Sequence, residues 1–179
     1  MKKILIILIL FINFELLADQ NDSRLNDLFQ ELKKSSNEQQ INEITGKIWD
    51  IWLETNDVQI EKYFTQGLKY LNSNNYQLAI ISFTKVININ PNFAEAWNKR
   101  ATVYYILGDF DSSVSDIEKT LKLEPRHFGA LDGLALIFLS IQDYQNAYKI
   151  YDRILKIFPN NSNIIQKKNF ALQKLSNSI

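Results

Sequence analysis

The stretch Thr120–Pro125 reads TLKLEP, an apolar helix ending followed by a proline. Two stretches of the same kind, Val86–Pro91 and Ile154–Pro159, lie 34 residues before and after it, and together the three contain every proline of the chain. Proline cannot continue a helix, because it lacks the N–H group and its ring clashes with the preceding turn. A helix end that recurs every 34 residues therefore predicts a structural unit repeated at that period.

Other residue types recur with the same period. In each unit a turn former precedes an aromatic residue, a small residue follows one turn later, and a large residue comes one turn after that. The three sets are Asn75, Tyr76, Ala79 and Phe83; Asp109, Phe110, Ser113 and Ile117; Asp143, Tyr144, Ala147 and Tyr151. The preceding segments match as well, with Tyr63, Gly67 and Tyr70; Trp97, Ala101 and Tyr104; Leu131, Ala135 and Phe138. Antiparallel helices approach closely where one side chain is small and a large one fills the gap, so helical hairpins turning near Asn75, Asp109 and Asp143 are predicted.

This order of aromatic, small, aromatic and proline positions resembles the tetratricopeptide repeat family over residues 60–159. The resemblance implies an all-α fold, a right-handed superhelix of antiparallel helix pairs, with repeats at 60–93, 94–127 and 128–161. The stretches Trp97–Tyr105 and Glu124–Leu131 further resemble a group of exported alphaproteobacterial members that has no settled activity. Repeats of this kind present a surface to another molecule.

The segments on either side of the repeats predict further helices. Apolar residues at helical spacing in residues 22–35 and 37–55 predict a hairpin within residues 19–58. We interpret it as a degenerate repeat that caps the N-terminal end of the stack. After Pro159, the polar run Asn160–Asn163 can cap a last helix, so residues 162–179 are expected to form a C-terminal capping helix.

Residues 1–18 differ in kind from the rest of the chain. Lys2 and Lys3 precede the apolar run Ile4–Ile12, and Ala18 precedes a polar stretch. This order is typical of a secretory signal peptide, and the run is shorter than the about 20 residues that cross a bilayer. We therefore expect export, with a periplasmic protein after cleavage at Ala18; an uncleaved anchor in the inner membrane is the alternative.

The composition excludes several classes of function. Lys plus Arg and Asp plus Glu number 20 each, so the formal net charge is zero and no basic surface for nucleic acid is expected. The chain has no cysteine, which excludes disulfides and thiol chemistry. His127 is the only histidine, so a multi-histidine metal site is excluded, and we interpret it as a turn residue that caps a helix or stacks on an aromatic ring. No cofactor, metal or catalytic residue is predicted, and we expect no enzyme.

The resemblance places a concave groove along the first helix of each repeat. The candidate groove residues are Phe64, Leu68 and Leu71; Asn98, Thr102 and Tyr105; Asp132, Leu136 and Leu139. Asn98 and Tyr105 can hydrogen-bond an extended peptide, whereas the leucines can either hold apolar side chains or belong to the core. The family's carboxylate clamp needs a lysine and an asparagine where this chain has Phe64 and Leu68, so an acidic C-terminal peptide is not expected to bind in that mode.

Arg100 stands at a repeat position where leucine is usual. An isolated buried guanidinium is costly, so it requires a carboxylate. Asp116 is the first candidate and Asp132 the second. The pair is either a buried contact that sets the register of the helices or an anion receptor at the groove.

These features predict a non-catalytic adaptor in the bacterial cell envelope, which docks a peptide or a helix of a partner protein in its groove. The alternative is a structural subunit of an envelope assembly that uses its convex face or its caps. In either case the partner is a protein, and contact with the membrane is expected only through an uncleaved N-terminal segment.

Overall fold

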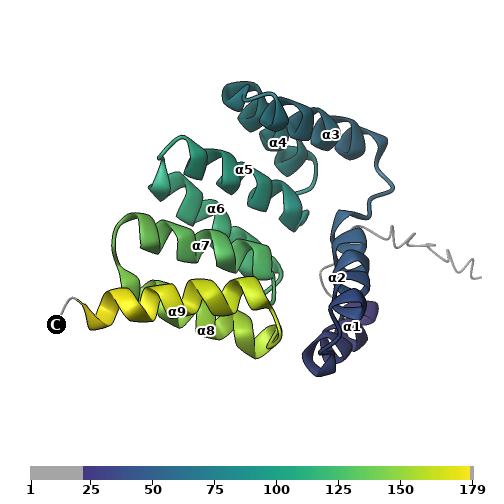
Figure 1. Ribbon diagram of the computed structural model, residues 1–179. Coiled ribbons are helices and arrows are strands. Elements are labelled where there is room, and N and C mark those ends of the chain that lie inside the picture. The colour runs from purple at the N-terminus through teal and green to yellow at the C-terminus, as the bar shows by residue number, and fades with distance from the viewer. Residues whose placement is uncertain (1–21, 178–179) are drawn as a thin grey trace, which may run out of the picture.

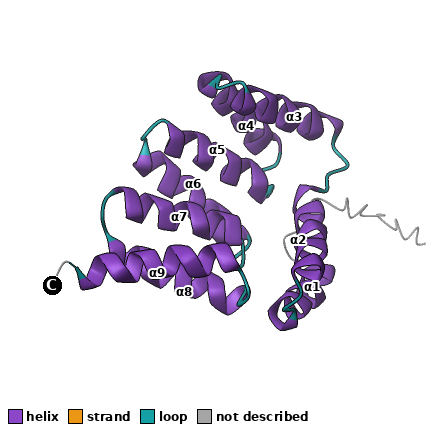
Figure 2. Ribbon diagram, in the orientation of Figure 1, coloured by secondary structure: helices purple, strands orange, loops and turns teal. Residues whose placement is uncertain are grey.

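The computed structural model describes residues 22–177, which form nine helices and no strand (Figure 2). The helices are α1 (Ser23–Lys34), α2 (Glu38–Leu53), α3 (Val58–Asn72), α4 (Tyr76–Ile89), α5 (Ala94–Ile106), α6 (Phe110–Leu123), α7 (Phe128–Ser140), α8 (Tyr144–Ile157) and α9 (Ser162–Ser176). Most begin at a polar residue whose side chain accepts a backbone N–H of the first turn. These residues are Asp22, Asn37, Asp57, Asp109, His127, Asp143 and Asn161.

The three predicted repeats correspond to the helix pairs α3–α4, α5–α6 and α7–α8, and α9 packs on α8 (Figure 1). The turns fall where the sequence places them, because Asn75, Asp109 and Asp143 are the N-caps of α4, α6 and α8. Each of these helices ends just before its C-cap residue, and the proline follows that residue directly. The predicted all-α stack of antiparallel helix pairs is thus confirmed.

The small residues of the pattern are the points of closest helix approach. Ala79, Ala101 and Ala147 are buried. A Cβ atom added to Gly67 on α3 would lie 2.6 Å from the Phe83 ring on α4, closer than any carbon–carbon contact allows. The small position in the first helix and the large position in the second are therefore two halves of one contact.

The predicted N-terminal hairpin forms, but it does not stack in front of the first repeat. Instead, α1 packs on α8 and α2 packs on α5, and neither packs extensively on α3 or α4. In Figure 1 the hairpin stands at one side of the stack, across the ends of its helices. Its interpretation as a cap stacked on the first repeat is wrong.

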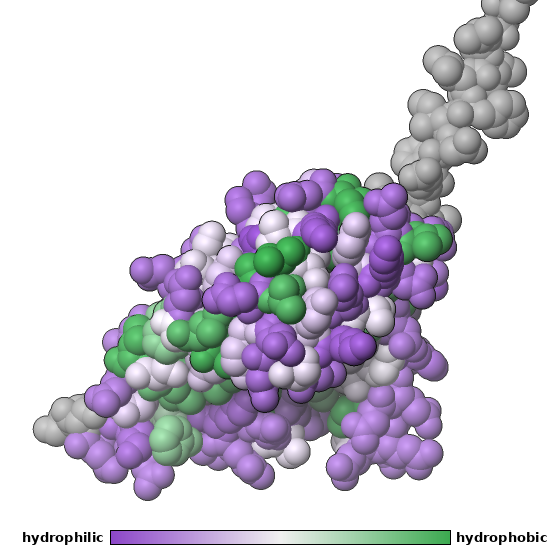
Figure 3. All heavy atoms as spheres, turned by 90° about the horizontal axis from the view of Figure 1, so that it is seen from above, coloured by the Kyte–Doolittle hydropathy of each residue, from purple (hydrophilic) through white to green (hydrophobic). Residues whose placement is uncertain are grey.

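The physical reason lies in the two surfaces that the hairpin could cover. Its core residues, which include Leu25, Leu32 and Trp52, pack against Phe128 and Phe158, which lie at the start of α7 and at the end of α8 in the third repeat. The outer side of α3 is instead polar, with Glu61, Lys62, Thr65, Gln66 and Lys69 beside Val58 and Tyr70. Seen from above, the end of the stack formed by α3 and α4 is mostly hydrophilic, with apolar residues in small groups (Figure 3). Terminal repeats need such a face for solubility, and within residues 22–177 the stack begins at α3.

Within residues 22–177, no helix is both long enough and apolar enough to cross a membrane. The predicted signal peptide, residues 1–18, lies outside the described residues.

Candidate binding groove

A pocket of about 150 Å³ lies between α5 and α7. It brings together five of the predicted groove residues: Asn98, Thr102 and Tyr105 from α5, and Asp132 and Leu136 from α7. We call this site the α5–α7 groove. Ala101, Gly129 and Gly133 also line it, and none of the three fills the space between the two helices with a large side chain.

The polar groups of the groove are held by neighbours. The Asn98 side chain is buried, and its amide nitrogen donates to Glu95 at 3.3 and 3.4 Å. The Tyr105 hydroxyl lies 3.3 Å from Ser140 Oγ. Asp132 accepts two hydrogen bonds from Lys167 of α9, at 2.7 and 2.9 Å. Because the carboxylate is paired, the groove presents amide and hydroxyl groups rather than a net charge.

The groove does not extend to α3 as the resemblance implied. Phe64 is buried in the core of the first repeat, where its ring meets those of Phe83 and Phe93 with centroids 5.7 and 5.3 Å away. Leu68 and Leu71 pack against the same core. The expectation that Phe64 lines the groove is therefore wrong, because burying its ring between α3, α4 and the start of α5 removes it from water. Leu68 is partly buried and lies outside the α5–α7 groove.

Arg100 pairs with Asp116, the first of the two candidates. Its Nε and Nη2 donate to the two oxygens of Asp116 at 2.7 and 2.8 Å, and its Nη1 donates to Thr84 Oγ1 at 2.9 Å. The guanidinium thus joins α4, α5 and α6, and the rings of Trp97 and Tyr104 flank it. Since its nitrogens are occupied by protein groups, the geometry favours the register contact over the anion receptor.

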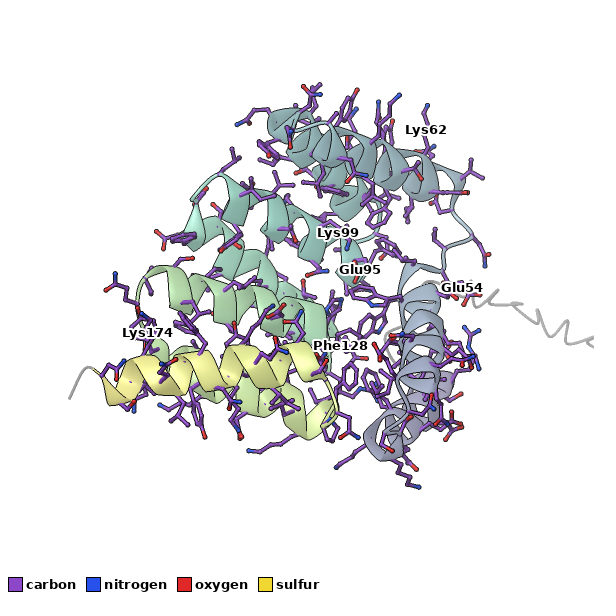
Figure 4. All side chains as sticks on the ribbon, viewed as in Figure 1. Glu54, Lys62, Glu95, Lys99, Phe128 and Lys174 are labelled. Atoms are coloured by element: carbon purple, nitrogen blue, oxygen red, sulfur yellow. The ribbon has the colours of Figure 1, made fainter. Side chains whose placement is uncertain are left out.

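A second polar cluster lies where α2 meets α5 and α7 (Figure 4), and no spacing in the sequence indicated it. His127 and Glu95 are both fully buried, and His127 Nε2 lies 2.5 Å from Glu95 Oε1. The Trp52 ring stacks on the His127 ring, with centroids 4.2 Å apart and planes inclined by 10°. His127 thus caps a helix and stacks on an aromatic ring, as its interpretation as a turn residue predicted.

The hydrogen bonds of His127 define its tautomer. Its Nδ1 accepts the backbone N–H of Ala130 at 3.0 Å, so that nitrogen carries no proton. Nε2 therefore carries the proton and donates a hydrogen bond to the Glu95 carboxylate. Burial alone would raise the pKa of Glu95, but the His127 ring, then Lys99 and Asn98, stabilise the carboxylate and leave that pKa below its ordinary value.

Two buried polar atoms of the described residues have no hydrogen-bond partner: Trp52 Nε1 and Tyr151 Oη. Burial, together with Asp132 and Tyr105, raises the pKa of the Tyr151 hydroxyl, which keeps it protonated. Neither atom belongs to a cluster with metal-binding chemistry, and residues 22–177 contain no group of three or more His, Asp or Glu side chains that could hold a metal ion.

The fold and the groove are those of a repeat protein built from helix pairs, and comparison with known proteins identifies the class. Profiles of the tetratricopeptide repeat match residues 61–93 and 98–162. A TPR repeat-containing protein of the alphaproteobacterium Rhizobium etli is 31% identical over 153 residues, which cover 86% of this chain and 75% of that protein. The chain belongs to the tetratricopeptide repeat family.

More distant relatives share the repeats alone. The small glutamine-rich tetratricopeptide repeat-containing protein 2 of Mycosarcoma maydis is 29% identical over 114 residues. These residues cover 64% of this chain and 32% of that protein. Among solved structures, the first TPR of Spaghetti (RPAP3) bound to the HSP90 peptide SRMEEVD superposes with a TM-score of 0.63 at 23% identity, covering 69% of this chain and 98% of that one. The TPR2B domain of yeast Sti1 in its pHsp70 complex gives 0.61 at 20% identity, covering 66% and 99%. At these identities the likeness shows the fold.

Proposed function

We propose that this protein is a non-catalytic adaptor that binds an extended segment of a partner protein in the α5–α7 groove. The observation that carries the proposal is the convergence of Asn98, Thr102 and Tyr105 with Asp132 and Leu136 in one pocket. Amide and hydroxyl groups at this spacing can bond the backbone of an extended peptide, and Leu136 supplies an apolar contact. The tetratricopeptide relatives whose structures hold peptides support binding as the mode of action.

The chemistry of the groove favours a neutral ligand segment. The RPAP3 domain holds the acidic peptide SRMEEVD, and the corresponding basic clamp of the family is missing here. Phe64 is buried at one clamp position, Leu68 packs on the core at the other, and the carboxylate of Asp132 already neutralises Lys167. An acidic C-terminus would find no free cation in the groove, so the proposed ligand is an internal, uncharged stretch of chain.

A selection experiment tests this proposal. The protein is used to select binders from a library of random, unmodified dodecapeptides, and the best peptide is titrated against the variants Asn98→Ala and Tyr105→Phe. Loss of one hydrogen bond should weaken binding about threefold to tenfold in each. Gln66→Ala, on the polar end face of α3, is the matched control and should bind as the parent does. Selection of no peptide that discriminates the parent from an Asn98→Ala/Tyr105→Phe double variant would refute groove binding.

The proposal includes export to the bacterial envelope. It is supported by Lys2 and Lys3 before the apolar run Ile4–Ile12 and by Ala18 before the polar segment. Cell fractionation with intact-mass measurement distinguishes the alternatives. A soluble periplasmic chain that begins at Asp19 supports cleavage, and a membrane-bound chain that retains residues 1–18 supports the anchor. A soluble cytoplasmic chain that retains these residues contradicts export.

A structural subunit of an envelope assembly remains the second candidate function, and one observation favours it. Ile165 and Leu172 lie seven residues apart on α9, the last helix of the stack, and are 40% and 50% exposed. Another element stacked on α9 would cover them. Self-association that Ile165→Gln and Leu172→Gln abolish, with no selected peptide, would favour this candidate over the adaptor.

A further inference from the structure

We propose that Glu95 and His127 are positioning residues, which turn the Asn98 amide so that its oxygen faces the α5–α7 groove, and that the α1–α2 hairpin holds them in place. The consequence for binding rests on the proposed function, whereas the positioning itself can be observed without a ligand. The proposal goes further than a list of groove residues, because it states which hydrogen-bonding group the groove presents and what sets it.

The first step is the contact between Glu95 and Asn98. A carboxylate can only accept hydrogen bonds, and both Glu95 oxygens lie within 3.4 Å of the Asn98 amide nitrogen. A flipped amide would set its oxygen against the carboxylate. The Asn98 oxygen therefore points away from Glu95, and the groove offers an acceptor at this position. A backbone N–H of an extended peptide is the donor that it fits.

The second step is the contact between His127 and Glu95. Both nitrogens of the His127 ring are engaged, one by the backbone N–H of Ala130 and one by Glu95. The ring can neither turn over nor move without exposing the first turn of α7. Lys99 adds a weaker contact, with its Nζ 3.6 Å from Glu95 Oε2. Glu95 is thus held by two residues: His127, the N-cap residue of α7, and Lys99 of its own helix α5.

The third step is the contact between the hairpin and His127. Trp52 of α2 covers one face of the imidazole, and Trp49 meets it edge-on at 5.6 Å. Lys99 Nζ also lies 5.2 Å from the centroid of the Trp49 ring. The helix α2 therefore contacts both side chains that hold Glu95, namely His127 and Lys99. Figure 4 shows Glu95 and Lys99 at the end of α5 that faces the hairpin, with Phe128 at the start of α7 beside them.

A second link joins the hairpin to the same groove. Gly129 lines the groove, and a Cβ atom on it would lie 3.1 Å from Cη2 of Trp49. The hairpin therefore touches the groove wall directly as well as through His127 and Glu95. If His127, Glu95 and Asn98 only filled space, apolar side chains would suffice. Buried polar side chains cost free energy unless each is paired.

The test follows the side-chain amide signals of Asn98 in the full chain, uniformly labelled with 13C and 15N, by NMR. His127→Asn keeps a good N-cap for α7 but removes the ring that reaches Glu95. Glu95→Gln keeps the size of the side chain and removes the charge that orients the amide. In both variants the Asn98 NH₂ signals should shift or broaden. Trp52→Phe retains a ring over His127 and should leave them in place, whereas Trp52→Ala should move them. Gln66→Ala is the control variant that should match the parent.

Unchanged Asn98 signals in His127→Asn and Glu95→Gln, with helicity and melting temperature retained, would overturn the proposal. Should both variants unfold, an acid titration of the parent decides. The Asn98 signals must move together with the Glu95 side-chain carboxyl carbon, and signals that stay fixed while Glu95 gains its proton refute positioning. Since no ligand is present, this readout is independent of the peptide selection: moving signals without any selected peptide leave the positioning intact and remove only the proposed function.

Discussion

The repeat stack and the N-terminal hairpin are built from similar amphipathic helices, but they are placed by different kinds of contact. From α3 to α9, each helix packs chiefly on its neighbours in sequence. The hairpin does not pack extensively on α3, its neighbour in the sequence. It contacts residues about a hundred positions away instead. Arg126 donates to Asn26 at 2.8 Å, and Asn160 donates to the carbonyl of Ser35 at 2.6 Å. Local packing repeats and can be read from a period, whereas the docking of the hairpin rests on contacts that occur once.

This difference predicts separate stabilities for the two regions. Repeat stacks are held by nearest-neighbour interfaces, so loss of the hairpin should leave α5–α8 folded. The hairpin has no comparable neighbour, and its core is completed by Phe128, Ile157 and Phe158 of the repeats. It should therefore open as one unit when that contact is weakened.

The largest expected effect is that of Trp52→Ala. Trp52 is fully buried between the hairpin and His127, and a change of this size typically costs about 3–5 kcal/mol. Hydrogen exchange should accelerate throughout α1 and α2 while α6 and α8 stay protected. Phe170→Ala, at a ring that is 46% exposed on α9, is the control and should alter stability by about 0.5 kcal/mol or less. Equal loss of protection in α6 and α8 would contradict the separation of the two regions.

Arg100→Leu tests the contacts inside the stack. Leucine suits the repeat position, but the change leaves the buried Asp116 carboxylate unpaired, so a loss of about 3 kcal/mol is expected. Adding Asp116→Ala should recover much of it, and the double-mutant cycle measured by chemical denaturation should show strong coupling. Additive effects would mean that the pair does not set the register of α5 and α6. The α1–α2 hairpin should lose protection only as far as the whole protein loses stability.

A pair of glycine substitutions compares the two regions directly. Gly67→Ala places a methyl group 2.6 Å from the Phe83 ring and should destabilise the stack by about 1–3 kcal/mol. Gly46→Ala lies on the exposed side of α2 with no atom within 4 Å and should stabilise the hairpin by up to about 1 kcal/mol. Thermal melts of the two variants should shift in opposite directions. An unchanged melting temperature in Gly67→Ala would show that the closest approach of α3 and α4 does not lie at Gly67.

The smallest effect concerns pH. The pKa of Glu95 is lower in the folded protein than its ordinary value, so its contribution to stability is present above the pKa of the unfolded chain and is lost as the pH falls through the folded value. Tryptophan fluorescence of Trp49 and Trp52 should report hairpin release only at pH values below the ordinary glutamate pKa of about 4.3. Glu95→Gln should remove this component of the acid transition. An unchanged transition in that variant would show that Glu95 does not govern docking.

The positions that repeat were predictable because they solve the same packing problem each time. The turns at Asn75, Asp109 and Asp143 and the small sites at Gly67 and Ala79 follow from the 34-residue spacing. The partner of Arg100 was also predictable, since a buried guanidinium needs a carboxylate and Asp116 lies on the facing helix of the same repeat. Even the polar residue Gln66 now has a reason. It stands where Arg100 stands in the next repeat, but neither α1 nor α2 packs extensively on α3.

The sequence by itself determined the family, the helices and the order of the stack, because a fixed period encodes contacts between neighbours. Only the tertiary structure decided where the hairpin lies, that Phe64 is core rather than groove, and that Trp52, His127, Glu95 and Asn98 form one series. This set of residues does not recur from repeat to repeat, and Trp52, Glu95 and His127 lie at least 32 positions apart in the chain. Their meeting depends on which apolar surface remains uncovered when the repeats have packed, and no local pattern carries that information.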